Sequence, residues 1–221
     1  MSKEHQVARG FQKNMDDEQF MEMLNNILEP HQEENYRDLE ETFPSLFIIG
    51  PPRSGSTLLS QFLSSSLDIG YINNLIAAFW KAPMFGIRLS EKLLSGYRES
   101  SFRSHFGRTS GIAEPHEFGY FWRTFFGDDH LSQPVIEASN SIDWNRLGRV
   151  LINMTHSFKK PVLYKYLPII WHMEAFRKRL KNLLFIRIKR DPVQNAISIF
   201  RSRQKFLSSS RDWLSLKPRV Y

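Results

Sequence analysis

Residues 46–59 read Leu-Phe-Ile-Ile-Gly-Pro-Pro-Arg-Ser-Gly-Ser-Thr-Leu-Leu, and this stretch decides the fold. The apolar run that opens it ends at Gly50, which is typical of a short, buried parallel strand. From Thr57 to Leu67 the apolar residues recur at helical spacing, so a helix is expected after the loop. A strand, a glycine-containing loop and a helix in this order predict the first unit of an α/β fold.

The rest of the chain continues this alternation. The expected strands lie at 161–164 and 182–188, and the expected helices at 144–158, at 169–180 and from 192 to about 206. The region 69–135, rich in aromatic residues and glycine, is expected to form helices and loops inserted between strands. The pattern predicts a three-layer α/β fold, with a parallel sheet covered by helices on both faces.

The first 44 residues have a different character. Apolar residues between Asp16 and Glu29 fall at helical spacing, and Pro30 is expected to end that helix. We therefore predict an acidic helical arm at 1–44, docked on the main domain or on a partner, and an α/β domain at 45–221.

Charge is distributed unevenly along the 221 residues. The chain carries 30 Lys and Arg against 23 Asp and Glu, but residues 1–45 hold 4 against 11 and residues 159–221 hold 16 against 3. A basic final third predicts an anionic partner: nucleic acid, an acidic membrane or a phosphorylated small molecule. The chain contains no Cys, which excludes disulfides and thiolate sites. With no long apolar run and no signal-peptide core, we expect a cytoplasmic protein without a membrane span.

The loop from Gly50 to Thr57 has the spacing of a phosphate-binding loop, in which backbone N–H groups converge on an anion. Nucleotide hydrolases place Lys before the final Ser or Thr, and a magnesium-binding carboxylate on another strand. Here Ser56 takes the lysine position, the expected strands 161–164 and 182–188 contain no acidic residue, and the basic side chain is Arg53. The loop therefore predicts phosphate binding without a metal.

Residues 51–59 resemble the 5′-phosphosulfate loop of sulfotransferases that use 3′-phosphoadenosine 5′-phosphosulfate (PAPS) as sulfuryl donor. The resemblance implies that Arg53 contacts the oxygen that bridges to the sulfate. It also implies a cradle for the 5′-phosphosulfate formed by Pro52, Arg53, Ser54, Gly55, Ser56, Thr57 and Leu58.

A second segment, residues 185–198, looks like the 3′-phosphate site of the same family. It has an apolar strand, then Arg190-Asp191-Pro192, then Ser198 eight residues after the arginine. Asp191 and Pro192 suit a helix start. The resemblance, which spans about residues 46–200, implies that Arg190 and Ser198 bind the 3′-phosphate. It implies a phosphate-loop-type fold and sulfuryl transfer to a hydroxyl or amine of a small-molecule or glycan acceptor, with no metal and no nucleic acid.

The general base is left open. Many family members have a His just before the 3′-phosphate strand, but here the corresponding stretch reads Lys165-Tyr-Leu-Pro168. The candidates are His116, whose ordinary pKa suits a base, and the neighbouring carboxylates Glu117 and Glu114. Lys165 is expected to assist Arg53 at the leaving group.

Alternatives follow from the same residues. Family members usually continue to a basic, glycine-containing loop over the nucleotide, whereas this sequence stops at Tyr221, so the resemblance implies a truncated form, a minimal variant or a weak donor binder. The rival functions are a phosphate-loop kinase or hydrolase, a catalytically impaired nucleotide-binding relative, and a non-enzymatic binder of anions.

Overall fold

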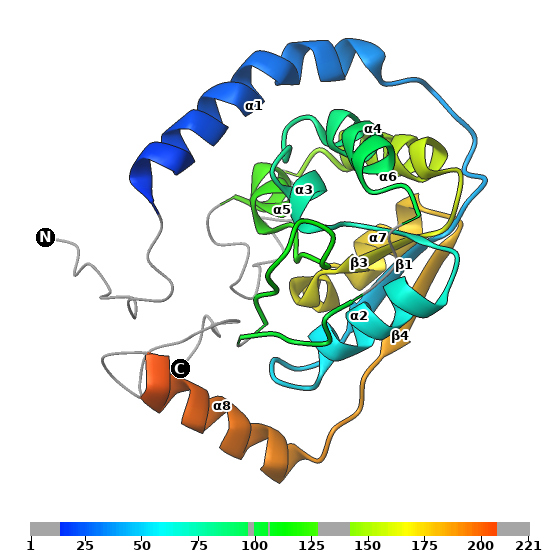
Figure 1. Ribbon diagram of the computed structural model, residues 1–221. Helices are drawn as coiled ribbons and strands as arrows, with labels where there is room; N and C mark the ends of the chain where they lie inside the picture. Colours follow the sequence, from blue (N-terminus) through cyan, green and yellow to red (C-terminus); the bar gives the residue numbers. More distant parts are fainter. Residues whose placement is uncertain (1–13, 97–99, 106, 128–141, 207–221) are drawn as a thin grey trace, which may run out of the picture.

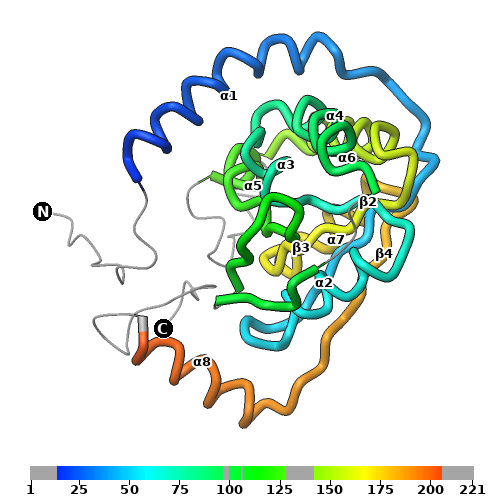
Figure 2. Tube along the Cα trace, viewed as in Figure 1, coloured from blue at the N-terminus to red at the C-terminus, as the bar shows by residue number. Residues whose placement is uncertain are grey.

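A four-stranded parallel sheet lies at the centre of the protein, in the order β2-β3-β1-β4 (Figures 1 and 2). The computed structural model describes residues 14–96, 100–105, 107–127 and 142–206. The strands are β1 (Ser45–Ile49), β2 (Gly70–Tyr71), β3 (Val162–Lys165) and β4 (Leu183–Arg187). The α/β fold predicted from the sequence is confirmed, whereas the two-residue strand β2 is too short to stand out in the sequence.

One face of the sheet carries an aromatic core. Phe47 of β1 stacks on Tyr164 of β3 with 5.0 Å between ring centroids, and it also contacts Trp122 and Phe176. Trp122 belongs to α5 (Gly119–Phe126) and Phe176 to α7 (Met173–Arg179). Helix α6 (Trp144–Phe158) lies on the same face, where its Trp144 contacts Phe176. Helix α6 has the predicted bounds, and its apolar stripe is buried because it packs against this core.

Helix α2 (Ser56–Ser66) covers the other face. Successive residues of a strand point to opposite faces, so Lys165 points away from Tyr164, and its Nζ donates to the Thr57 hydroxyl of α2 at 2.7 Å. Helices therefore cover both faces, and the three layers are confirmed. Helix α2 buries a polar side, formed by Ser56, Thr57, Ser60, Gln61 and Ser64, while Leu58 and Phe62 are exposed.

Two sequence-based boundaries are wrong. Helix α1 (Met15–Asn35) continues through the exposed Pro30. A proline inside a helix removes one backbone hydrogen bond and favours a break, but Gln32 and Glu33 beyond it are held by the Met84 N–H and by Arg146. The helix expected at 169–180 is divided at His172 into a 3₁₀ turn, η3 (Leu167–Trp171), and α7.

The remaining helices are α3 (Asn74–Ala77), α4 (Pro83–Leu93) and α8 (Pro192–Phe206). Helix α8 projects from the body along one end of the molecule, and α1 runs along the opposite end (Figure 1). Within the described residues, no helix is long and apolar enough to cross a membrane.

Candidate active site

The phosphate loop connects β1 to α2 at the carboxyl end of the sheet, where parallel sheets bind ligands. Gly55 caps α2 with φ 97° and ψ 14°, a conformation that glycine adopts without steric cost. Arg53 also has a left-handed backbone, with φ 65°. A non-glycine residue held there costs on the order of 1 kcal/mol and is found more often at functional sites than elsewhere.

The segment after β4 supports this loop. A guanidinium N–H of Arg190 donates to the backbone carbonyl of Arg53, and the Asn195 side chain donates to the carbonyl of Pro52 at 2.9 Å. Asp191 caps α8 by accepting from the Gln194 N–H at 2.8 Å, as predicted. The buried Asn195 was missed, because an amide on a predicted helix gives no sign that it will bind a loop 143 residues away.

A cavity of about 270 Å³ opens between the phosphate loop and α8. It contains the predicted Arg53, Arg190 and Ser198 together. The complete lining consists of Arg53, Arg190, Gln194, Ile197, Ser198, Arg201, Ser202 and Lys205. Four of these side chains are cationic and none is acidic, so the cavity suits an anion.

The two arginines reinforce this preference. Partial burial lowers the pKa of Arg53, and the positive charge of Arg190 lowers it further. An arginine guanidinium carries a positive charge at neutral pH. Like charges held close together repel each other, and a bound anion would remove that repulsion.

The loop residues fit a phosphate or sulfate group. The Ser54 hydroxyl is buried and has no hydrogen-bond partner among the described residues. The first turn of any helix also leaves backbone N–H groups without helical partners, and in α2 these belong to Ser56, Thr57 and Leu58. The side chain of Leu58 itself is exposed, so only its backbone can serve such a group.

A second cluster lies on the sheet side of α2. The Lys165 ammonium is buried, donates to the Thr57 hydroxyl and forms a 2.7 Å ion pair with Glu117. The carbonyl of Gly107 lies 3.4 Å from the same nitrogen. An ammonium is thus placed beside the final threonine of the phosphate loop from β3, although position 56, where phosphate-loop hydrolases carry their lysine, is a serine.

His116 and Glu117 are adjacent in sequence but differ as bases. Nδ1 of His116 accepts a hydrogen bond from the Phe118 N–H at 2.9 Å, so in the neutral ring Nε2 carries the proton and no nitrogen lone pair is free. Loss of hydration lowers the pKa of His116, and the cations Lys165 and Arg108 lower it further while Glu117 opposes them. The Glu117 side chain, by contrast, is 54% exposed and has an accessible carboxylate.

Glu114 has a structural position. Burial alone would raise its pKa, but hydrogen bonds from Gln61, Ser101 and Ser100 outweigh burial and lower it. Its carboxylate accepts from the Gln61 amide at 2.8 Å and so joins α2 to the segment before α5. An ionised carboxylate that already accepts this many hydrogen bonds is a weak proton acceptor.

The described residues contain no group of three or more His, Asp or Glu side chains that could hold a metal ion. The structure thus brings together two groups of predicted residues, Arg53 with Arg190 and Ser198, and Lys165 with Thr57 and Glu117. The phosphate loop and the first turn of α2 connect them. The C-terminal residues up to Tyr221 lie outside the described part of the chain.

Comparisons with known proteins agree with this geometry. Residues 44–217 match the model of the sulfotransferase family. A search of curated proteins gave no match. Among solved structures, the sulfotransferase STF9 from Mycobacterium avium is similar in fold, with a TM-score of 0.50 and 14% identity over 84% of this chain and 53% of STF9.

The sulfotransferase STF1 from Mycobacterium tuberculosis H37Rv aligns with a TM-score of 0.47 and 13% identity, over 87% of this chain and 56% of STF1. The chain therefore spans about half the length of these two solved enzymes. The family match, in contrast, extends over more than half of this chain, from just before β1 to beyond α8. The protein belongs to the sulfotransferase family.

Proposed function

We propose that the protein transfers a sulfuryl group from PAPS to a hydroxyl or amine of a small-molecule or glycan acceptor. The observation that carries this proposal is the cavity in which Arg53, from the phosphate loop, lies with Arg190 and Ser198, from the β4–α8 segment. A nucleotide with anionic groups at both its 5′ and 3′ positions matches two separate phosphate-binding segments that share one cavity. Such a donor supplies a sulfuryl group on a good leaving group.

Each side chain then has a distinct role. Arg190 and Ser198 hold the 3′-phosphate, and the backbone of residues 52–58 holds the 5′-phosphosulfate. Arg53 donates to the oxygen on which negative charge develops, and Lys165, beside Thr57, adds a second positive charge near the same loop.

Glu117 is the base in this proposal, because its carboxylate is accessible while both ring nitrogens of His116 are occupied. Glu117 takes the proton from the attacking hydroxyl or amine, and the Lys165 ammonium keeps the carboxylate in place. Substitution of each residue in turn tests which of the two is the base. Glu117→Gln should lower transfer by about 10²-fold or more, whereas His116→Asn keeps an acceptor for the Phe118 N–H and should retain most of the activity.

Binding is tested by calorimetric titration with 3′-phosphoadenosine 5′-phosphate in the presence of a metal chelator. Arg190→Ala and Ser198→Ala should weaken this nucleotide far more than adenosine 5′-phosphate, which lacks the 3′-phosphate. The matched control is Arg187→Ala, on an exposed arginine of β4 outside the cavity lining, which should leave both affinities unchanged. Equal weakening of both nucleotides would remove the 3′-phosphate assignment.

Transfer is tested separately with Arg53→Ala, which should abolish turnover while leaving much of the nucleotide binding. Magnesium-dependent ATP turnover, without a preference for the 3′-phosphate, would instead support a phosphate-loop kinase or hydrolase. Tight nucleotide binding without transfer to any hydroxyl or amine acceptor would support a catalytically impaired relative.

A further inference from the structure

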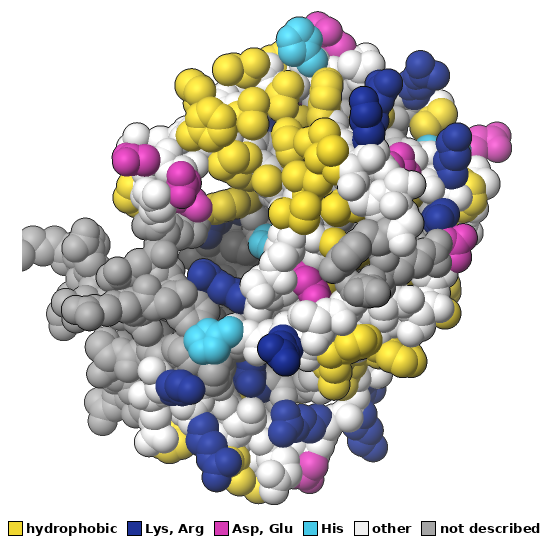
Figure 3. All heavy atoms as spheres, viewed as in Figure 1, with side chains coloured by type: hydrophobic (Ala, Val, Ile, Leu, Met, Phe, Trp, Pro, Cys, Tyr) yellow, Lys and Arg dark blue, Asp and Glu magenta, His cyan; other side chains and the backbone are white. Residues whose placement is uncertain are grey.

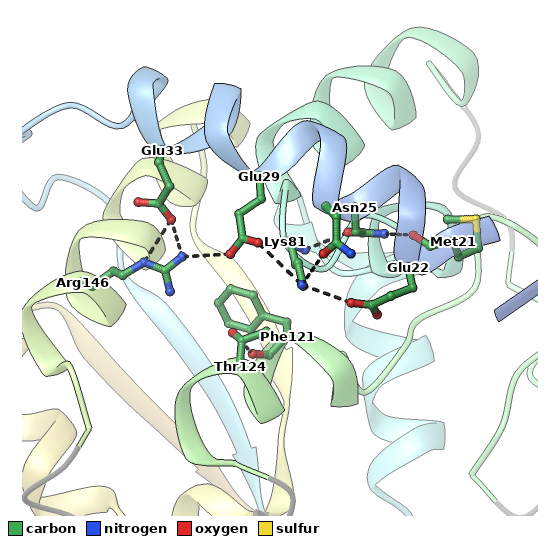
Figure 4. A network of polar contacts seen from close by, with 10 residues as sticks. Met21, Glu22, Asn25, Glu29, Glu33, Lys81, Phe121, Thr124 and Arg146 are labelled. Carbon is green, nitrogen blue, oxygen red and sulfur yellow. Dashed lines mark hydrogen bonds and ion pairs between the residues drawn. The ribbon is translucent and has the colours of Figure 1, made fainter. Parts of the chain in front are cut away.

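Helix α1 contacts the rest of the protein through polar side chains. Asn25 and Gln32, two helical turns apart, are fully buried and bond to the backbone at the end of α3 and the start of α4. Asn25 donates to the carbonyl of Ala78 and accepts from the Lys81 N–H, and Gln32 accepts from the Met84 N–H. Figure 4 shows the part of this contact face around Asn25 and Lys81.

Ion pairs add to the contact. The Lys81 ammonium lies 3.1 Å from Glu22 and 3.6 Å from Glu29, and Arg146 of α6 pairs with Glu33 and with Glu29 (Figure 4). The polar side chains on the inward side of α1 therefore have hydrogen-bond or ion-pair partners in the body of the protein. Its apolar residues Phe20, Met23 and Ile27 lie on the opposite side, with exposed fractions of 56%, 52% and 57%.

The outer side of α1 is thus an apolar stripe on an acidic helix. The stripe spans roughly 10 Å of helix, because its members are three and four residues apart. Helix α1 contains seven Asp and Glu residues and no Lys or Arg. Three of these carboxylates, on Asp16, Asp17 and Glu34, are exposed and form no ion pair with any described residue.

Helix α8 has the same arrangement with the opposite charge. Val193, Ile197 and Phe200 form an exposed stripe of equal length, with exposed fractions of 64%, 38% and 50%. The helix contains Arg201, Arg203 and Lys205 and no acidic residue. In the space-filling view, hydrophobic side chains gather toward α1 and several Lys and Arg side chains gather toward α8 (Figure 3).

From this match we infer that the protein self-associates, with α1 of one copy packed antiparallel against α8 of a second copy. Within a single chain the two stripes cannot cover each other, because α1 and α8 lie at opposite ends of the molecule (Figure 1). In the antiparallel arrangement Phe20 faces Phe200 and Ile27 faces Val193. The same register brings Asp16 and Asp17 of one copy toward Arg203 and Lys205, in the last turn of α8 of the other copy.

Other pairings of these two helices are disfavoured by charge. Two α1 helices would bring together acidic side chains, among them Asp16, Asp17 and Glu34 of each copy, and two α8 helices would bring together basic side chains. An acidic membrane would repel α1 and would leave its stripe uncovered. Of these pairings between described helices, the contact between α1 and α8 is the one that covers both stripes and brings opposite charges together.

Sedimentation velocity of the full chain tests this inference. The wild type should self-associate at concentrations of about 100 μM, and more weakly at about 500 mM than at about 50 mM salt. Ile27→Lys places a cation against basic α8, and Val193→Asp places an anion against acidic α1. The new lysine lies on an acidic helix and the new aspartate on a basic helix, so neither charge disturbs the helix that carries it. We therefore expect both variants to fold correctly and to self-associate about tenfold or more weakly.

A mixture of the two variants gives the sharpest readout. Mixing Ile27→Lys with Val193→Asp restores association, since one contact between the copies is wild type and the other pairs a lysine with an aspartate. The control Phe62→Asp changes an equally exposed side chain of α2 and should associate like the wild type.

A wild type that remains monomeric, or a Val193→Asp variant that associates normally, would overturn the inference. Monomers that bind phosphatidylserine vesicles through Val193 would overturn it as well, and would assign α8 to a membrane surface. Ile197, Arg201 and Lys205 of α8 also line the cavity of the proposed function, whereas the substituted Val193 does not. The sedimentation runs contain no nucleotide, so their outcome does not depend on whether sulfuryl transfer occurs.

Discussion

The two faces of the central sheet differ in the side chains that cover them, which are apolar on one face and polar on the other. The face that carries Phe47 and Tyr164 is packed with rings and aliphatic side chains from α5, α6 and α7. The face that carries Lys165 meets the polar side of α2, where Thr57 and Gln61 are held by hydrogen bonds. One face thus supplies most of the apolar burial, while the other positions the phosphate loop and its charges.

The difference shows what an apolar repeat can and cannot predict. Helices α2 and α6 both have leucines at helical spacing, and both helices form where the sequence predicts them. In α6 that stripe is buried, whereas in α2 the serines face the sheet and Leu58 faces solvent. The orientation of α2 follows from its attachment to the phosphate loop and from the Gln61–Glu114 and Thr57–Lys165 hydrogen bonds.

The largest difference between the two faces is expected from a matched pair of leucines. Leu151→Ala in α6 removes a fully buried side chain and should lower the free energy of unfolding by about 2–5 kcal/mol. Leu58→Ala in α2 should change it by less than about 0.5 kcal/mol, because Leu58 is 57% exposed. Urea denaturation measures both, and equal losses would contradict the assignment of the two faces.

The aromatic face should also give an acid-dependent loss of stability. Burial against Phe126 lowers the pKa of His172 to about 4, from an ordinary value of about 6.5. Below pH 6.5 the unfolded chain therefore binds this proton more readily than the folded protein. Stability should fall as the pH drops from about 6.5 to 4, by up to about 3 kcal/mol from this group.

His172→Phe keeps an aromatic ring at this position and removes the group that binds the proton. Denaturation at a series of pH values should show a smaller loss for this variant than for the wild type between pH 6.5 and 4. Identical pH dependence in the two proteins would show that His172 is protonated equally well in the folded and unfolded states.

The polar face should respond more weakly. Gln61→Ala removes the donor to Glu114 and the donor to the Arg103 carbonyl, and should cost about 1–2 kcal/mol. Ser65→Ala, on the outer side of the same helix, should cost less than about 0.5 kcal/mol. Thermal unfolding of the pair separates the buried bonds from helix propensity, and similar losses would rule out a specific contribution from Gln61.

Local chemistry explains the features that the sequence predicted well. Helix α6 begins at its predicted residue because Asp143 accepts from the Arg146 N–H, and Asp191 starts α8 in the same way. Arg190 precedes α8 and Ser198 lies two turns into it, eight residues later. This local spacing brings both side chains to the same cavity.

Long-range contacts explain what was missed. The pairing of Lys165 with Glu117 joins β3 to a loop 48 residues earlier, and nothing near either residue indicates it. Residues Arg201 and Lys205 line the cavity because α8 turns one side toward the phosphate loop, which periodicity alone does not orient. The persistence of α1 beyond Pro30 likewise depends on Gln32 and Glu33, which bind the body of the protein.

The left-handed backbone of Arg53 has an evolutionary consequence. Glycine adopts this conformation without strain, so Arg53→Gly should stabilise the fold by up to about 1 kcal/mol while removing the guanidinium from the cavity. Selection for thermostability alone would then favour the loss of this side chain, and selection for anion chemistry would retain it. A higher melting temperature in Arg53→Gly, together with lost transfer, would show that this position exchanges stability for activity.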